Sequence, residues 1–220
     1  MGYILCIETS TTNCSVSLAK EGKVLAFEED YDTKYSHAER LHNYIDKVIK
    51  DAEITFKDLS AVSVSKGPGS YTGLRIGVST AKGLCYALGI PLISVPTLQG
   101  LSMQVVFDGN HSIVSMIDAR RMEVYSSVFS SSHEEIRETK AEILTQESFS
   151  EYLQNGKVYF IGNGVEKFSA ICNDDNAVFI QNKLPSSKEM AILSFSKFIE
   201  KEFEDVTYFE PYYLKDFVTG

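Results

Sequence analysis

Three strand-length apolar segments open the chain, and only short polar turns separate them. They cover residues 3–9, 14–20 and 24–30. This spacing is typical of an antiparallel meander. A helical pattern follows over 36–52, with Ser36 as the expected N-cap. The first part of the chain therefore predicts a small sheet with a helix beside it.

Beyond this helix the sequence alternates between strand-like and helix-like patterns, and then the order restarts with a second meander. Periodicity, together with glycine and proline at the ends of segments, predicts each element. The expected elements are a strand at 59–65, a helix at 72–88, a strand at 91–95, a helix from about Thr97, strands at 112–119, 122–130 and 134–141, a helix at 146–154, a strand at 157–162, a helix after Gly164, a strand at 177–181 and a helix at 186–203.

The two halves share this order of elements although their residues do not match. A meander followed by alternating helices and strands indicates a central sheet covered by helices. We therefore expect an α/β protein with an N-terminal lobe over 1–104 and a C-terminal lobe over 105–204. Residues 205–220 are expected to pack back on the N-terminal lobe.

Charge and composition narrow the classes of function. The net charge is −9, and the longest basic cluster is Arg120-Arg121. Gripping a nucleic acid needs clustered Lys and Arg, so any RNA is expected to be held mostly by another chain. No apolar run approaches the roughly 20 residues that span a bilayer. The first residues lack signal-peptide features and the four cysteines lack ligand spacing, so reduced thiols and a cytoplasmic location are expected.

A glycine-rich turn, SKGPGSYTGLRIG at 65–77, joins a strand to a long helical pattern. It lacks the GxxxxGK[ST] order of a P-loop. The free N–H groups of a helix start favour an anion by about 0.3–1 kcal/mol, and Ser70 or Thr72 can cap the helix. The alternative to an anion site is a tight strand-to-helix connection, which is the commoner role of such a turn.

The helix at 72–88 has one stripe with almost no side-chain volume, because Gly73, Gly77 and Ala81 recur at intervals of four. Glycine inside a helix costs up to about 1 kcal/mol relative to alanine, so these glycines need a packing reason. The stripe packs either on the chain's own sheet or on a partner helix. The residues alone leave this choice open.

No set of side chains has the spacing of a catalytic or metal centre. His37 and His42 lie five residues apart, which separates them by roughly 140° around a helix. A single metal ion therefore cannot easily bind both imidazoles. The sequence also has no GxSxG motif, the turn that presents a nucleophilic serine. Glu8 and the hydroxyl-rich turn 9–12 could hold a metal–phosphate group, or could form a hairpin turn bonded to its own backbone.

Several segments taken together resemble one known family. In chain order they read ILCIETSTTNCSVSLAKEGKVL, SHAERLH, SKGPGSYTGLRIGVSTAKGL, PLISVPTLQGL, IDARRMEVY and EPYYLKD. The chain is similar over residues 3–216 to the TsaB family, formerly YeaZ, which works in making threonylcarbamoyladenosine on tRNA. The resemblance implies a two-lobed ASKHA fold, a duplication of the actin-like ATPase or ribonuclease H-like architecture with a mixed sheet and flanking helices in each lobe.

The same resemblance implies a non-catalytic subunit. TsaB-type proteins bind and activate TsaD, which performs the threonylcarbamoyl transfer, and both work with the ATPase TsaE. A TsaD-like subunit and a TsaE-like ATPase are therefore the expected partners, with tRNA reached through the complex, a homodimer when the chain is alone, and no membrane. The expected partner surface on the helices at 36–52 and 72–88 consists of Leu41, Tyr44, Ile45, Val48, Gly73, Arg75, Ile76, Gly77, Ser79, Lys82 and Tyr86.

A missing motif supports the expected absence of catalysis. TsaD carries an HxxxH pair that binds the catalytic metal, and the resemblance places Thr97 and Leu101 at these positions. Leucine cannot ligate a cation, so neither a bound metal nor a catalytic residue is expected. Two alternatives remain: a small-molecule ATP-dependent kinase of the ASKHA group, and an inactive metallopeptidase-like (glycoprotease) homologue.

Cofactor expectations also follow from the resemblance. ASKHA proteins usually offer an acid and a hydroxyl turn to phosphates, and Glu8, Thr9 and Ser10 keep that pattern loosely. We expect no cofactor and weak or absent ATP binding by the isolated chain, and leave open a nucleotide at the interface between subunits. Asp118 and Arg120 are expected either to order the crevice between the lobes or to bind something there.

Overall fold

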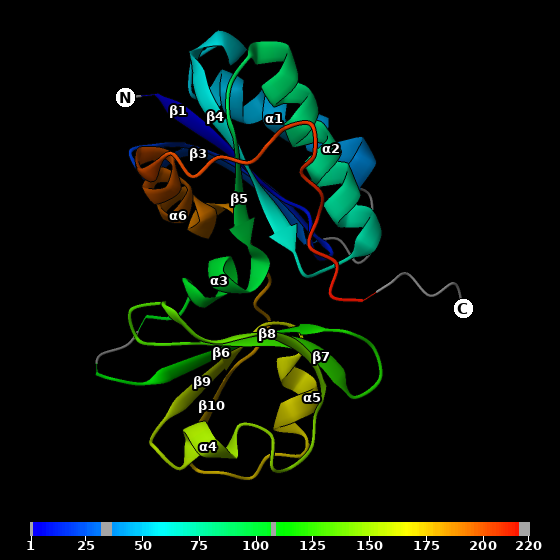
Figure 1. Cartoon of the computed structure of the whole chain (residues 1–220), viewed down its shortest axis with the longest axis vertical. Coiled ribbons are helices and arrows are strands. Elements are labelled where there is room, and N and C mark those ends of the chain that lie inside the picture. Colours follow the sequence, from blue (N-terminus) through cyan, green and yellow to red (C-terminus); the bar gives the residue numbers. More distant parts are fainter. Residues whose placement is uncertain (1, 32–36, 107–108, 216–220) are drawn as a thin grey trace. The chain divides into compact units, whose positions relative to one another are not determined.

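The computed structural model describes residues 2–31, 37–106 and 109–215. The chain divides into two compact units, of which one joins the residues up to Gly100 with those from Pro185 onward, and the other spans residues 101–184. Each unit has its own sheet and helices (Figure 1).

The sheet of the first unit contains β1 (Tyr3–Glu8), β2 (Asn13–Lys20), β3 (Lys23–Tyr31), β4 (Leu59–Gly67) and β5 (Leu92–Pro96). Their order across the sheet is β3-β2-β1-β4-β5. The first three strands pair antiparallel, which confirms the expected meander. Strand β4 runs parallel to β1, and β5 runs parallel to β4.

Helices cover both faces of this sheet. On one face lie α1 (His37–Asp51) and α2 (Tyr71–Leu88), and on the other lies α6 (Ser187–Glu200) (Figure 1). Successive side chains of a strand point to opposite faces of the sheet, so each strand contributes apolar side chains to a core on either face. Along β1, Leu5 and Ile7 join the core under α1 and α2. Ile4 and Cys6, which alternate with them, join the core under α6.

Helix α2 begins and ends where its sequence predicts. The hydroxyl oxygen of Ser70 accepts a hydrogen bond from the Gly73 N–H at 3.3 Å, so Ser70 rather than Thr72 is the N-cap. Gly89 ends the helix in the left-handed conformation, with φ of 65°. The predicted N-cap of α1, Ser36, lies outside the described residues.

The second unit repeats the sheet order of the first. Three strands form an antiparallel meander, and two further strands continue the sheet in parallel from β6, giving the order β10-β9-β6-β7-β8. This repetition confirms the two-lobed α/β class. The bounds are β6 Ser112–Asp118, β7 Glu123–Phe129, β8 Glu135–Ile143, β9 Val158–Ile161 and β10 Ala177–Ile180, with helices α4 Ser150–Leu153 and α5 Val165–Ser169.

The core of the second unit depends on aromatic packing because its helices are short. The helix expected at 146–154 is a single turn. A cluster of phenylalanine rings fills the space beside the sheet, with ring centroids between 4.9 and 6.0 Å apart. Its members are Phe149, Phe160, Phe168 and Phe179.

The structure differs from the expected division at 104 and 204. The last helix, α6, packs against β1, β2 and β5, and so belongs to the first unit and not to the second. Met190 and Ala191 on α6 are each 1% exposed. They cover a sheet face that would otherwise expose its apolar side chains, and this requirement cannot be seen in the periodicity of the helix itself.

After α6 the chain returns along the first unit as a C-terminal tail, residues 204–215. The tail crosses the edge strand β5 and then runs beside α2, as the orange-to-red segment in Figure 1. Two further short helices complete the described chain: η1 (Phe56–Asp58), before β4, and α3 (Thr97–Ser102), after β5.

Candidate functional site

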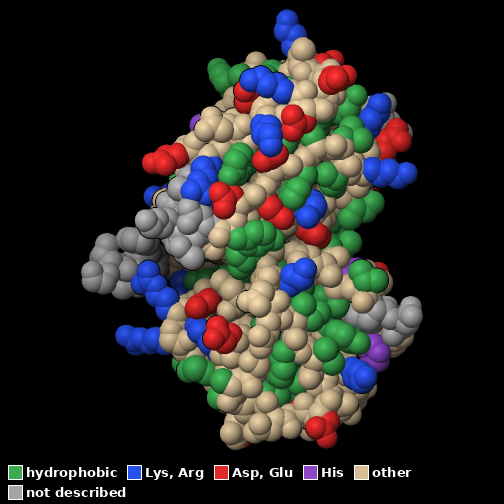
Figure 2. Space-filling view, turned by 180° about the vertical axis from the view of Figure 1, so that it is seen from behind, with side chains coloured by type: hydrophobic (Ala, Val, Ile, Leu, Met, Phe, Trp, Pro, Cys, Tyr) green, Lys and Arg blue, Asp and Glu red, His purple; other side chains and the backbone are tan. Residues whose placement is uncertain are grey.

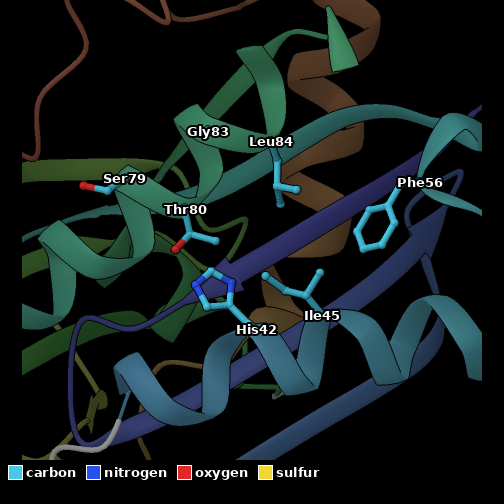
Figure 3. A pocket seen from close by; sticks show the side chains of 7 residues that line it. All are labelled: His42, Ile45, Phe56, Ser79, Thr80, Gly83 and Leu84. Carbon is cyan, nitrogen blue, oxygen red and sulfur yellow. The ribbon is translucent and has the colours of Figure 1, made fainter. Parts of the chain in front are cut away.

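A groove of about 510 Å³ lies between α1 and α2. In Figure 3, His42 and Ile45 rise from α1 toward Thr80 and Leu84 on α2, and the Phe56 ring closes one end. The walls are mostly apolar, with an imidazole and two hydroxyl groups at the rim. The residues that line the groove are His42, Ile45, Phe56, Ser79, Thr80, Gly83 and Leu84.

The glycines of the small-residue stripe of α2 pack against the chain's own turn after β1. A Cβ built on Gly73 would lie 2.1 Å from the Thr9 carbonyl oxygen, and one built on Gly77 would lie 2.3 Å from the Thr9 hydroxyl oxygen. Both glycines are buried. The prediction that Gly73 and Gly77 contact a partner is therefore wrong, because the turn after β1 occupies the space beside them.

Gly83 behaves differently from the other helical glycines. A Cβ at this position would meet nothing within 4 Å, and the residue is exposed at the edge of the groove. Its position lies roughly 120° around the helix from that of Gly77. The chain's own packing does not require glycine here, although glycine costs up to about 1 kcal/mol in a helix.

On α1, most of the predicted partner residues contact the chain's own core or its sheet instead of the surface. Leu41 and Val48 are fully buried under the helix, so their side chains do not reach the surface, and their assignment to it is corrected. Tyr44 is half-buried, and its hydroxyl donates to Asp30 on β3 at 3.2 Å. Only Ile45, itself 3% exposed, reaches the floor of the groove.

The predicted residues on α2 also separate by face. Arg75 and Lys82 point to the C-terminal tail, where Lys82 donates to the Phe209 carbonyl oxygen at 2.9 Å. Ile76 is half-buried against the core. Ser79 and Tyr86 are exposed, and Tyr86 is 86% exposed.

Sequence reasoning missed His42, Phe56, Thr80, Gly83 and Leu84 as surface-forming residues. The available signal was Gly83, the glycine of the helix that does not fit the four-residue stripe. We keep the name α1–α2 surface for the groove residues together with Tyr86.

The turn with Glu8, Thr9 and Ser10 is closed by the chain itself. These residues are at most 1% exposed. A Glu8 carboxylate oxygen accepts from the Ser10 N–H at 2.6 Å, and the Ser10 carbonyl oxygen accepts from the Ser70 N–H at 2.6 Å. Burial raises the pKa of the Glu8 carboxyl, and hydrogen bonds from Ser10 oppose this shift. A nucleotide could reach these groups only after the turn opened.

Thr97 and Leu101, which the resemblance places at the positions of the HxxxH pair, have structural roles. The Thr97 hydroxyl lies 2.6 Å from that of Ser65 and accepts from the Gly67 N–H at 3.1 Å, which ties α3 to the end of β4. Leu101 is fully buried. Among the described residues, no group of three or more His, Cys, Asp or Glu side chains could hold a metal ion.

The four cysteines are free and buried, as expected. Burial raises the pKa of the Cys6 thiol to about 11 and that of Cys85 to about 11. A thiol with a raised pKa is mostly protonated at neutral pH, so these groups are poor nucleophiles.

Asp118 and Arg120 form the turn between β6 and β7. The Asp118 carboxylate accepts from the Lys167 ammonium and from the Arg120 N–H, both at 2.6 Å. Arg120 and Arg121 both have positive φ, 72° and 50°, which makes the turn tight. Their place in a crevice between the lobes stays a prediction.

On the face shown in Figure 2, the described residues form no extended basic area. Figure 2 shows acidic and basic side chains interspersed over the face in view, and the net charge is −9. Within the described ranges, no helix has the length and apolar character that a membrane span requires.

Comparisons with known proteins agree with this architecture. Residues 31–219 match the family model described as TsaD, tRNA N6-adenosine threonylcarbamoyltransferase. The tRNA threonylcarbamoyladenosine biosynthesis protein TsaB of Escherichia coli (strain K12) is 29% identical over 221 residues, covering 97% of this chain and 94% of that protein. The Bacillus subtilis (strain 168) protein of the same name is 39% identical over 129 residues, covering 57% and 54%.

Solved structures give the same result. A Pseudomonas aeruginosa protein described as similar to peptidase YEAZ has a TM-score of 0.84 and 25% identity, with 98% of this chain and 100% of that chain covered. The activator of 2-hydroxyisocaproyl-CoA dehydratase from Clostridium difficile has a TM-score of 0.50 at 12% identity, with 93% and 98% covered, and shares the fold alone.

The repeated sheet order and its covering helices define a two-lobed α/β protein of the ASKHA class. Since the family model spans most of the sequence, the chain belongs to the TsaD family, and its relatives place it in the TsaB (YeaZ) branch of that family.

Proposed function

We propose that this chain is a non-catalytic subunit of the machinery that makes threonylcarbamoyladenosine on tRNA, and that it binds and activates a TsaD-type transferase in the cytoplasm. The α1–α2 surface is the binding site. The observation that carries the proposal is the open position of Gly83 beside an apolar groove.

Glycine at position 83 is useful to a helix that another backbone approaches closely. It supplies no side chain, weakens the helix, and fills no space inside its own chain. The adjacent groove offers Ile45, Phe56 and Leu84 as apolar area, and Tyr86 is a large exposed aromatic side chain nearby. Aromatic and aliphatic anchors beside a pocket are the usual centre of a protein interface.

Several observations support a subunit without catalysis of its own. Thr97 and Leu101, which the resemblance places at the positions of the metal-binding pair, have internal packing roles. The described residues contain no metal-ligand cluster, and their thiols are buried. The acidic chain with interspersed charges fits tRNA contacts made through the complex, with a TsaE-like ATPase as a further partner.

The test is association with the TsaD-type transferase of the same organism, measured by calorimetry, together with tRNA modification by the reconstituted complex. Gly83→Arg places a long charged side chain on the α1–α2 surface. We expect it to fold, to weaken association by at least about tenfold, which is about 1.4 kcal/mol, and to reduce stimulation of transfer in parallel.

A matched control is Ser196→Arg, which adds the same side chain to the exposed face of α6 on the other side of the sheet. It should bind like the wild type. The proposal fails if the wild-type chain does not bind the transferase, or if Gly83→Arg binds as tightly as Ser196→Arg. Sedimentation of the same variants tests whether the isolated chain forms a homodimer through this surface.

The kinase alternative has a separate test. It needs an accessible phosphate site at Glu8, Thr9 and Ser10, which are covered by α2 and its preceding turn. We expect calorimetry with Mg-ATP to give no micromolar binding by the isolated chain. Micromolar binding with phosphoryl transfer to a small acceptor would establish the kinase instead. Stoichiometric metal in the purified chain, measured by elemental analysis, would favour the metallopeptidase-like (glycoprotease) alternative.

A further inference from the structure

The C-terminal tail connects the edge of the first sheet to α2, which it contacts from Tyr71 to Lys82. At its start, the Glu204 N–H donates to the Leu92 carbonyl oxygen of β5 at 2.8 Å, and the Glu204 carboxylate accepts from the Ser94 hydroxyl. This bridge covers part of an edge strand, which would otherwise present unpaired backbone groups. Val206 and Phe209 then pack against the core of the first unit.

The middle of the tail is held by one side chain of α2. The Lys82 ammonium donates to the carbonyl oxygens of Thr207 at 3.2 Å and of Phe209 at 2.9 Å. A charged donor shared by two backbone acceptors gives stronger hydrogen bonds than neutral donors do. Lys82 therefore ties α2 to the tail near the point where Phe209 enters the core.

The end of the tail reaches the glycine-rich turn. The Tyr212 N–H donates to the Lys66 carbonyl oxygen at 2.7 Å. Gly67 has φ of 109°, and a Cβ built there would lie 2.7 Å from the Tyr212 carbonyl oxygen. The first glycine of the turn is thus required by its backbone conformation and by the approach of the tail.

An arginine and two tyrosines form the contact between the end of the tail and the first turns of α2. The Arg75 guanidinium lies 3.9 Å from the centroid of the Tyr71 ring and donates to the Tyr213 hydroxyl at 3.1 Å. The rings of Tyr71 and Tyr213 are 4.9 Å apart. The tail therefore contacts α2 at its first turns as well as at Lys82.

The tail and the groove lie on different sides of α2. Lys82 and Leu84 project roughly 160° apart on a helix of 3.6 residues per turn. In Figure 3, Leu84 points from α2 toward α1, while Lys82 bonds the tail. Ser79 and Tyr86 lie within roughly 60° of Lys82 around the helix. Ser79, Gly83 and Tyr86 are nevertheless exposed, so the tail does not cover these members of the α1–α2 surface.

We propose that the tail is a brace that fixes α2 on the sheet and thereby holds one wall of the partner groove. Lys82, Arg75 and Tyr213 are positioning residues for association rather than partner contacts. The effect of the tail on partner affinity rests on the proposed function, whereas the bracing of α2 is a property of the isolated chain. Ordering α2 before association lowers the entropic cost of binding, which couples the tail to affinity.

The experiment compares the wild type with Lys82→Met and with a chain that ends at Pro211. Lys82→Met keeps the aliphatic stem and removes the donor, and the shortened chain keeps Val206 and Phe209 but loses the contacts to Lys66 and Arg75. Tyr208→Ala is the control, because this tail side chain is 81% exposed. Amide hydrogen exchange of the isolated chain and affinity for the TsaD-type transferase are both measured.

We expect exchange across α2 to become about tenfold faster in both test variants and to stay unchanged in β1 and β4. Affinity should fall by about tenfold, within the usual range of coupling between sites. Tyr208→Ala should match the wild type in both measurements. Unchanged exchange in α2 would overturn the brace, and faster exchange with unchanged affinity would overturn its coupling to the partner. If the wild type does not bind the transferase, the proposed function fails, and the exchange measurement still decides the brace.

Discussion

The Thr9 hydroxyl donates a hydrogen bond to the Gly73 carbonyl oxygen across 2.8 Å. Thr9 follows β1, and Gly73 lies in the first turn of α2, so this contact locks the hairpin turn against the start of the helix. Both residues are buried. The locked turn explains why the side of α2 that carries Gly73 and Gly77 must lie inside the first unit.

Gly77→Ala should destabilise the protein. Its Cβ would lie 2.3 Å from the Thr9 hydroxyl oxygen, and Thr9 is too tightly held by Gly73 to move at low cost. Overpacking of this kind costs about 1–3 kcal/mol, which corresponds to a melting temperature lower by about 2–4 °C for each kcal/mol. Thermal unfolding monitored by circular dichroism measures the change in melting temperature. An unchanged melting temperature would show that the stripe is not packed inside.

The same substitution at position 83 should have the opposite sign. The added methyl of Gly83→Ala would meet nothing within 4 Å, and alanine is the better helix former. We expect a gain of up to about 1 kcal/mol in the free energy of unfolding. Urea unfolding of the two alanine variants side by side provides the measurement. A loss of stability at position 83 would contradict the open environment described for this glycine.

Glu8→Gln should alter how stability depends on pH. Burial raises the pKa of Glu8 above its ordinary value of 4.5, so the folded chain keeps a proton that the unfolded chain releases. This contribution to stability is complete below the unfolded pKa and is lost as pH rises through the folded pKa. The variant does not titrate, so its stability relative to wild type should increase as pH rises from 4.5. Urea unfolding at several pH values tests this, and a constant difference would contradict it.

Thr97→Val should cost stability without touching any proposed partner contact. It removes the hydroxyl that lies 2.6 Å from the Ser65 hydroxyl and accepts from the Gly67 N–H. Leaving a buried donor without its acceptor costs about 1–3 kcal/mol. Thr97→Ser keeps the hydroxyl and is the control, so it should retain most of the stability that valine loses. Equal losses in the two variants would mean that the methyl group, not the hydrogen bond, matters at this position.

The order of elements was largely predictable because it depends on local periodicity. The meander strands, the end of α2 at Gly89 and the alternation after 112 all follow from short-range patterns. Less was predictable in the second unit, where the helix expected at 146–154 is only Ser150–Leu153. There, phenylalanine packing replaces helix length, and sequence periodicity does not report packing between distant residues.

The sequence and the structure point to the same two helices for the candidate surface, but several of the predicted residues lie inside the first unit or against the tail. Helical spacing identifies a stripe, yet it does not say which neighbour the stripe meets. A Cβ added at Gly77 would meet Thr9, 68 positions earlier in the chain, whereas a Cβ added at Gly83 would meet nothing within 4 Å. Lys82 and Arg75 look like surface charges in the sequence, and only the return of the tail assigns them internal partners.

By itself the sequence determined the class of fold and the sequence of strands and helices, and it shows Thr97 and Leu101 where the resemblance implies the metal-binding pair of TsaD. These features depend on residue identity and on periods of two and 3.6 residues. Only the tertiary structure decided that α6 covers the first sheet, that the tail lies along α2, and that the glycine stripe is internal. Each of these depends on which distant segments become neighbours when apolar faces are buried, and local patterns carry no record of that pairing.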